Sequence, residues 1–208
     1  SEEELAKYPH LSGDKVGDGR YEDVNKDGVL DQNDKTILGD NNPLFTAGFS
    51  NSFSYKNFTL DIQFTGSYGA EVFSFYKRMC GIYHGDRNGM IEQLGRWRSE
   101  SEPGDGIHFR PTRTPSGWQR DPSSAWVQDA SYLRLRNLTF GYNFDQKVLD
   151  KIKMKGLRLY VTGQNLFTVT NYVGYDPETS SESGLSQGGD YLGYPAARSF
   201  IIGANITF

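Results

Sequence analysis

Apolar and polar residues alternate along several long stretches of this chain. In residues 45–55 the odd positions are mostly aromatic or apolar, and the even positions are serine, threonine or glycine. A second alternating stretch, 58–68, follows after only Lys56 and Asn57. A period of two predicts a β-strand, and a two-residue link between two such stretches predicts a hairpin.

Three further stretches show the same alternation, at 132–144, 157–169 and 199–208. The first of them changes phase near Arg136 and Asn137, which predicts a β-bulge. Each stretch approaches or exceeds the roughly 10 residues with which a tilted strand crosses a bilayer, whereas globular strands average about 5 or 6 residues. We therefore expect an all-β fold made of transmembrane antiparallel barrel strands. A soluble β-sandwich with unusually long strands is the alternative, and five strands alone are too few to close a membrane barrel.

The links between these stretches alternate in length. The segments 1–44, 69–131 and 170–198 are long, Lys56-Asn57 is short, and 145–156 is intermediate. Outer-membrane barrels have short periplasmic turns and longer extracellular loops. We expect the long segments to be extracellular loops, and parity then places the last residue, Phe208, on the periplasmic side.

The amino-acid composition argues against several other classes of protein. Apolar residues make up 36% and aromatic residues 14% of the 208 residues, with 24 glycines, and this suits strands and turns better than a helical core. No apolar run reaches the roughly 18 residues of a transmembrane helix. The net charge of -4 with scattered basic residues gives no footprint for nucleic acid. Cys80 is the only cysteine, so no internal disulfide is possible.

The segment 23–34 fits the twelve-residue EF-hand-type calcium loop. Oxygen ligands recur at alternate positions, and Gly28 stands where the loop must turn sharply. We expect a structural calcium ion, bound by Asp23, Asn25, Asp27, the carbonyl of Val29, Asp31 and Asp34. Asp34 replaces the usual glutamate and resembles the dockerin variant of the motif. The alternative is a solvated Asp/Asn/Gly turn without metal.

Catalytic patterns are absent from the sequence. The three histidines, His10, His84 and His108, fall in separate segments without metal-ligand spacing, and no nucleophile elbow or phosphate-binding glycine loop is present. We therefore expect no enzyme activity. Aromatic residues of the loops could stack on sugar rings or pack the loops together, and packing is the favoured interpretation. The candidates for substrate contact are Trp118, Trp126, Tyr175 and Tyr191.

Several long motifs resemble one known family. The stretches 17–23 and 38–40, the strand 49–55, the segment 131–142, and 157–167 followed by 174–178 are similar, in this order, to the distal part of SusC/RagA-type TonB-dependent transporters. The resemblance extends over nearly the whole chain from Gly17 to Phe208.

This resemblance implies that the chain supplies the last five or so strands of a barrel of about 22 strands with a plugged lumen. It implies uptake of glycans or peptides through the bacterial outer membrane, together with a SusD-type surface lipoprotein that acts as a lid. Energy would come from the TonB complex, contacted through an N-terminal part that this chain lacks, and the terminal strand ending in Phe208 would be read by the barrel-assembly machinery. A secreted, calcium-stabilised β-domain that binds carbohydrate remains the alternative.

Overall fold

The computed structural model describes residues 1–81, 88–112, 122–178 and 187–208. They form two compact units, which are described separately. The sheet unit consists of Asp40–Glu71, Asp129–Ser180 and Gly193–Phe208. The loop unit consists of Ser1–Gly39, Val72–Gln128 and Ser181–Leu192.

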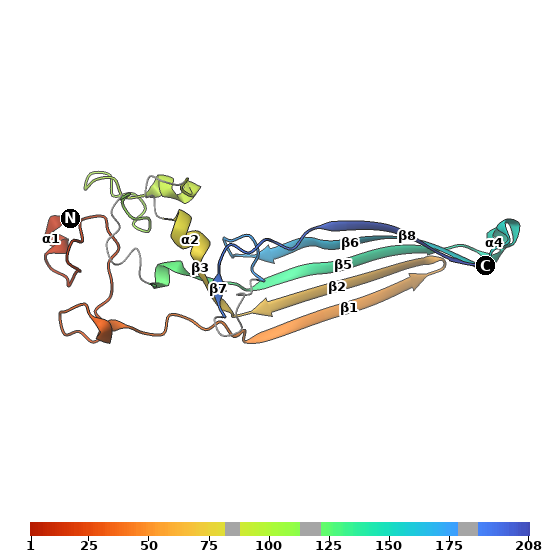
Figure 1. The fold of residues 1–208 in the computed structure, drawn as a ribbon, viewed down its shortest axis with the longest axis horizontal. Coiled ribbons are helices and arrows are strands. Elements are labelled where there is room, and N and C mark those ends of the chain that lie inside the picture. The colour runs from red at the N-terminus through yellow and green to blue at the C-terminus, as the bar shows by residue number, and fades with distance from the viewer. Residues whose placement is uncertain (82–87, 113–121, 179–186) are drawn as a thin grey trace. The chain divides into compact units, whose positions relative to one another are not determined.

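The sheet unit is built on one antiparallel sheet of five long strands (Figure 1). Its strands coincide with the five alternating stretches to within one residue at each end, and they lie in the order β1-β2-β5-β6-β8. Their bounds are β1 Phe45–Tyr55, β2 Phe58–Tyr68, β5 Tyr132–Asn143, β6 Gly156–Thr170 and β8 Ser199–Thr207. Aromatic and β-branched residues at alternate positions favour this extended conformation.

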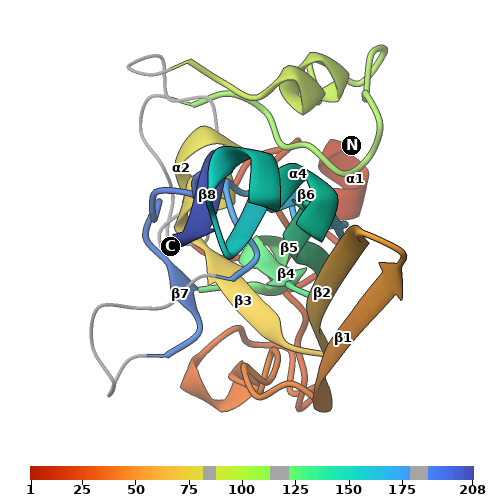
Figure 2. The same cartoon turned by 90° about the vertical axis from the view of Figure 1, so that its right-hand side faces the viewer.

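The short connections of the sheet gather at one of its ends, here called the turn end (Figure 1), and this end faces the viewer in Figure 2. The β1–β2 turn closes with Tyr55 opposite Phe58, and Asn143 N–H donates to the carbonyl of Asn57 at 2.8 Å. Lys155 N–H donates to the carbonyl of Thr207 at 2.8 Å. The Lys56-Asn57 turn and the last residues of β8 therefore lie at the same end of the sheet, as the parity of the strands predicts.

A short helix, α4 (Gln146–Ile152), joins β5 to β6 at the turn end. Alternation along the chain does not predict this helix, although Val148, Leu149 and Ile152 are spaced as on a helix. Leu149 is buried. The helix ends at Lys153, whose φ of 55° lies in the left-handed region.

Irregularities in the central strands have identifiable causes. Against β2, Phe64 pairs with Leu135 and Gln63 with Asn137, so Arg136 is the bulged residue of β5. The shift lies where the hydrophobic pattern changes phase. In β6, Gly163 pairs with Leu138 and leaves room for Leu166, whose side chain lies 2.7 Å from where a Cβ on Gly163 would stand.

The loop unit contains short elements around a small three-stranded sheet of order β4-β3-β7, in which β3 and β7 are parallel. Val72, Ser74, Gln93 and Trp126 are buried there. The elements are α1 Glu2–Leu5, a 3-10 turn Gln32–Asp34, β3 Glu71–Ser74, α2 Phe75–Cys80, 3-10 turns Ile91–Gly95 and Ser124–Trp126, β4 Val127–Asp129 and β7 Gly189–Asp190. Among the described residues, no helix combines the length and the apolar character that a membrane span requires.

Candidate functional site

The register of the five strands gives the sheet one apolar and one polar face. Directly opposed residues of antiparallel strands share a face, and the pairs Phe49–Phe64, Ile62–Leu138 and Val161–Ile202 join apolar positions across all five strands. Asn51 is a polar exception. The apolar face carries Phe45, Ala47, Phe49, Phe53, Tyr55, Phe58, Leu60, Ile62, Phe64, Tyr68, Leu133, Leu135, Leu138, Phe140, Tyr142, Leu157, Leu159, Val161, Phe167, Val169, Phe200, Ile202, Ala204 and Ile206.

Aromatic rings gather at both ends of this apolar face. At the turn end, the ring of Phe58 lies 4.9 Å from Tyr142 and 5.6 Å from Phe140, between ring centroids. At the opposite end, Phe45 stacks on Tyr68 at 5.5 Å. An apolar band bordered by two aromatic belts is the pattern of a strand wall in a lipid bilayer.

The apolar face has no layer packed on it among the described residues. Phe49 is 57% exposed, Phe200 72% and Ile202 84%. A soluble β-domain would bury such residues in its core, because each large apolar side chain removed from water contributes about 1.5–3 kcal/mol. Their exposure across the sheet favours a face that contacts hydrocarbon rather than water.

The opposite face is polar and internally hydrogen-bonded. Thr139 and Thr162 share a hydrogen bond of 2.8 Å between their hydroxyl groups, and Ser52 donates to Asp61 at 2.6 Å. The Arg158 guanidinium lies 3.8 Å from the Asp61 carboxylate. These contacts suit a wet surface, and they give this face a hydrophilic lining with paired charges.

A buried arginine on β5 forms ion pairs with two acidic residues of the connection between β6 and β8. Arg134 lies on the polar face of β5 with a side chain only 3% exposed, and its two terminal nitrogens reach Asp176 at 2.5 Å and Glu178 at 2.8 Å. Its Nε donates to the Thr168 hydroxyl at 2.9 Å. The bulge brings Arg136 to the same carboxylate of Glu178, at 2.6 Å. The cluster fixes residues 176–178 against β5 and β6.

Main-chain contacts complete this cluster. Asp176 accepts hydrogen bonds from the N–H groups of Ala196 and Glu178, both at 3.0 Å. Burial alone would raise the pKa of the Asp176 carboxyl, but these N–H groups and Arg134 outweigh burial and lower the pKa below its ordinary value. Sequence reasoning missed this site. Its available signal was the acidic pair Asp176 and Glu178, two residues apart in a loop.

The predicted calcium loop is curled by its own side chains. Asp23 accepts a hydrogen bond from Gly28 N–H at 2.8 Å, and Gly28 has a φ of 87°. Asp34 accepts from Val24 N–H at 2.9 Å and from Asp31 N–H at 2.8 Å, so the last predicted ligand folds back to the start of the loop.

These hydrogen bonds also affect the protonation of the Asp34 carboxyl. The N–H of Asp31 is the main cause that lowers the pKa of the Asp34 carboxyl, which keeps it ionised as a cation ligand requires. In the part of the chain that the structure describes, no three His, Cys, Asp or Glu side chains are gathered around one point as in a formed metal site. Besides carboxylates, the predicted ligand set includes the amide oxygen of Asn25 and the main-chain carbonyl oxygen of Val29.

The four aromatic candidates for substrate contact lie in different surroundings. Trp118 lies outside the described residues. The expectation for Trp126 is corrected, since this side chain is only 2% exposed and its indole cannot stack on a ligand. Tyr191 is 59% exposed but stacks on Phe75 at 4.1 Å. Tyr175 is 60% exposed. Trp126 and Tyr191 belong to the loop unit, and Tyr175 belongs to the sheet unit.

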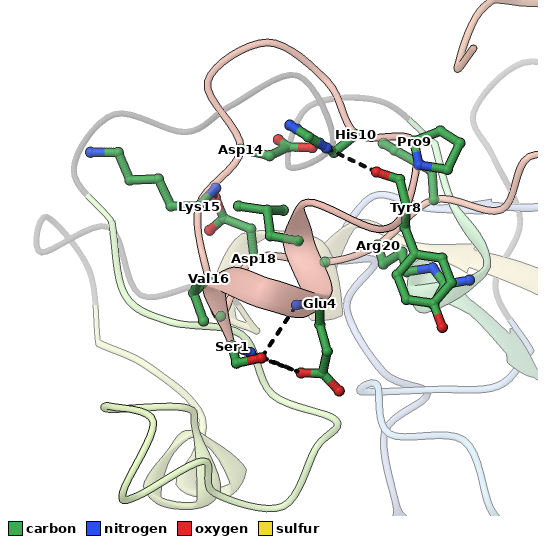
Figure 3. A pocket seen from close by; sticks show the side chains of 14 residues that line it. Ser1, Glu4, Tyr8, Pro9, His10, Asp14, Lys15, Val16, Asp18 and Arg20 are labelled. Atoms are coloured by element: carbon green, nitrogen blue, oxygen red, sulfur yellow. Dashed lines mark hydrogen bonds and ion pairs between the residues drawn. The ribbon is translucent and has the colours of Figure 1, made fainter. Parts of the chain in front are cut away.

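A pocket of about 320 Å³ lies in the loop unit and is lined by segment 1–21 (Figure 3). The Arg20 guanidinium covers the Tyr8 ring at 3.7 Å, and His10 Nδ1 lies 2.9 Å from the Tyr8 carbonyl oxygen. Asp18 pairs with Arg110 at 2.7 Å.

Comparison with known proteins points to a single family, although no family model matches the chain. The chain is 35% identical over 95% of its length to TonB-dependent receptor P3 of Formosa agariphila. It is 27% identical over 90% of its length to TonB-dependent receptor SusC of Bacteroides thetaiotaomicron. It spans 20% of the length of the first and 17% of the length of the second.

Solved structures agree with this result. A structure of the RagAB peptide importer in its 'open-open' state superposes with a TM-score of 0.67 and 25% identity, over 97% of this chain and 20% of that one. Another RagAB peptide transporter structure gives a TM-score of 0.71 over 87% of this chain and 19% of that one, at 24% identity, and supports the fold alone. The mostly β fold and the sequence likeness agree, and the chain is similar to a segment of the SusC/RagA-type TonB-dependent receptors.

Proposed function

We propose that the sheet forms part of the wall of a TonB-dependent nutrient importer in the bacterial outer membrane. The observation that carries the proposal is the two-faced sheet, whose exposed apolar face is bordered by aromatic belts while its other face is polar. In a barrel wall, the apolar face contacts lipid and the polar face lines the interior. The relatives are receptors and an importer, which agrees with a role without bond chemistry.

For the full-length protein, the proposal extends to the closed barrel, its orientation in the membrane, its partners and its cargo. The five strands would be the last of a closed barrel of about 22 strands, with the turn end in the periplasm and the long loops outside. A SusD-type lipoprotein would cover the barrel, the TonB complex would drive transport through another part of the protein, and the terminal strand ending in Phe208 would be read by the barrel-assembly machinery. Glycans or peptides are the proposed cargo, with the exposed ring of Tyr175 as a candidate contact.

The test uses the full-length protein that contains this chain. We expect it to remain folded only in detergent or lipid, to migrate differently on gel electrophoresis before and after boiling, and to be required for uptake of a glycan or peptide by the cell. A monomer that stays folded in plain buffer would reject the membrane assignment and favour the secreted β-domain. Correct insertion without any effect on uptake would reject import alone.

We also propose that segment 23–34 binds calcium as a structural ion. The curl of the loop supports this proposal, because Gly28 N–H donates to Asp23 in its tight turn and Val24 N–H donates to Asp34 at its end. Asp23, Asn25, Asp27, the Val29 carbonyl, Asp31 and Asp34 would hold it, and calcium would cross-link the loop by coordinating these oxygens. The loop is followed by extended chain rather than a helix, since Lys35 is in a β conformation, so a structural role is favoured over a sensor.

Removal of calcium should loosen the segment and leave the sheet intact. Trypsin can cut after Lys26 inside the loop and after Lys35 beyond it, and both side chains are exposed. We expect a chelator to speed cleavage at these two sites by several-fold, and added calcium to restore protection. Asp23→Asn should abolish the calcium effect, whereas Glu22→Gln should preserve it. Equal cleavage with and without calcium would remove the ion from the proposal.

A further inference from the structure

Five lysines surround the turn end of the sheet and form what is here called the basic collar, which consists of Lys56, Lys147, Lys151, Lys153 and Lys155. All five are exposed. None forms an ion pair within the described parts of the chain, and only two acidic residues, Asp145 and Asp150, stand among them. The collar is a local positive patch on a chain whose formal net charge is -4.

The collar borders the aromatic belt of the apolar face. Lys56 Nζ lies 5.4 Å from the centroid of the Tyr55 ring, which is itself 71% exposed. Phe144, which precedes α4, packs its ring against Tyr142 at 5.0 Å. The lysines therefore stand where the apolar band ends. In a bilayer this is the depth of the lipid phosphates.

Helix α4 has the composition of a helix that lies at a membrane surface. Val148 and Ile152, one turn apart, are 42% and 43% exposed, while Leu149 is buried toward the protein. Lys147 and Lys151, also one turn apart, form the adjacent basic stripe. Adjacent apolar and basic stripes allow a helix to insert its apolar side chains between lipids while its lysines contact phosphate.

Two lysines of the collar occupy left-handed backbone positions. Lys56 and Lys153 have φ values of 53° and 55°. In this region glycine or asparagine is preferred, and other residues are less stable. Backbone preference therefore does not explain lysine at these two positions.

We propose that the basic collar binds the headgroups of anionic phospholipids, and so anchors the turn end of the sheet at one membrane surface. This inference rests on the proposed membrane location and goes further by naming anionic phospholipids as ligands. The five ammonium groups complement the negative charge of the phosphates, and each lysine near an anionic surface adds to the attraction. A zwitterionic lipid offers the same apolar tails without the net charge.

The test compares phosphatidylglycerol with phosphatidylcholine as probes. The full-length protein, delipidated in detergent, is incubated with each lipid, and the retained lipid is counted by native mass spectrometry. We expect a preference for phosphatidylglycerol of about tenfold or more. The triple variant K147Q/K151Q/K155Q should lose most of it. The variant K147R/K151R/K155R should keep it, because charge is preserved.

The matched control is K7Q/K15Q/K35Q, which removes the same charge from exposed lysines of the loop unit and should keep the preference. Equal binding of both lipids by the wild type, or an unchanged preference in the K147Q/K151Q/K155Q variant, would overturn the inference. Gel migration before and after boiling reports insertion separately. A folded, inserted protein without lipid preference rejects the collar alone, whereas absence of insertion in any lipid rejects the membrane location and the collar with it.

Discussion

Replacement of Ile62 by arginine is expected to destabilise the inserted protein by about 2–4 kcal/mol. Ile62 lies near the middle of β2 on the apolar face, opposite Asn51 on β1 and Leu138 on β5. At the midplane of a bilayer an arginine on the lipid face must be dehydrated or must distort the lipid, and the cost is largest there. The quantity to measure is the free energy of unfolding of the full-length protein in lipid vesicles, by denaturant titration.

Gln63 supplies the matched control, because it is adjacent in sequence but lies on the polar face opposite Ser50 and Asn137. Gln63→Arg should change the free energy of unfolding far less than Ile62→Arg. Similar losses for the two variants would show that the faces are assigned wrongly. A larger loss for Gln63→Arg would mean that the apolar face does not contact lipid.

The double variant Asp176→Asn with Glu178→Gln should loosen the β6–β8 connection by about 3 kcal/mol of local stability. It leaves the buried guanidinium of Arg134 without either carboxylate, and an uncompensated buried charge costs about 3–5 kcal/mol. Hydrogen exchange at the main-chain amides of residues 172–178 measures the loss. Strands β1 and β2, which do not contact these carboxylates through any ion pair in the described residues, should keep their protection.

Glu102→Gln provides the comparison for this cluster, since Glu102 pairs with Arg98 at 3.6 Å and both side chains are at least half exposed. An exposed pair of this kind contributes only about 0–1 kcal/mol. If the double variant at Asp176 and Glu178 behaves like Glu102→Gln, the cluster does not hold the loop in place.

Acidification should weaken the same connection. The pKa of Asp176 is lowered in the folded protein, so its contribution is fully present above the ordinary pKa of an aspartate. That contribution is lost as pH falls through the lower pKa of the folded state. The protection factors of the amides at residues 172–178, which correct for the slower intrinsic exchange in acid, should therefore fall at acid pH before those of the sheet. The Asp176→Asn variant should lack this pH dependence.

Local periodicity determined the main sheet. A strand that separates an apolar from a polar surface must alternate its residues, so the stretches 45–55 and 58–68 and the two-residue turn between them could be read directly. The bulge at Arg136 was visible as a change of phase. Helix α4 is not visible in the pattern, because Gln146–Ile152 is short and carries only three apolar residues.

The sequence by itself thus determined the strands, their order along the chain and the family, because alternation and long motifs are local patterns. Only the tertiary structure decided which distant groups meet. Arg134 and Asp176 are 42 residues apart and become partners because β5 pairs with β6 and the following loop folds back. Burial also depends on the whole fold. Trp126 and Tyr175 look alike as loop aromatics in sequence, yet packing covers the first and leaves the second exposed.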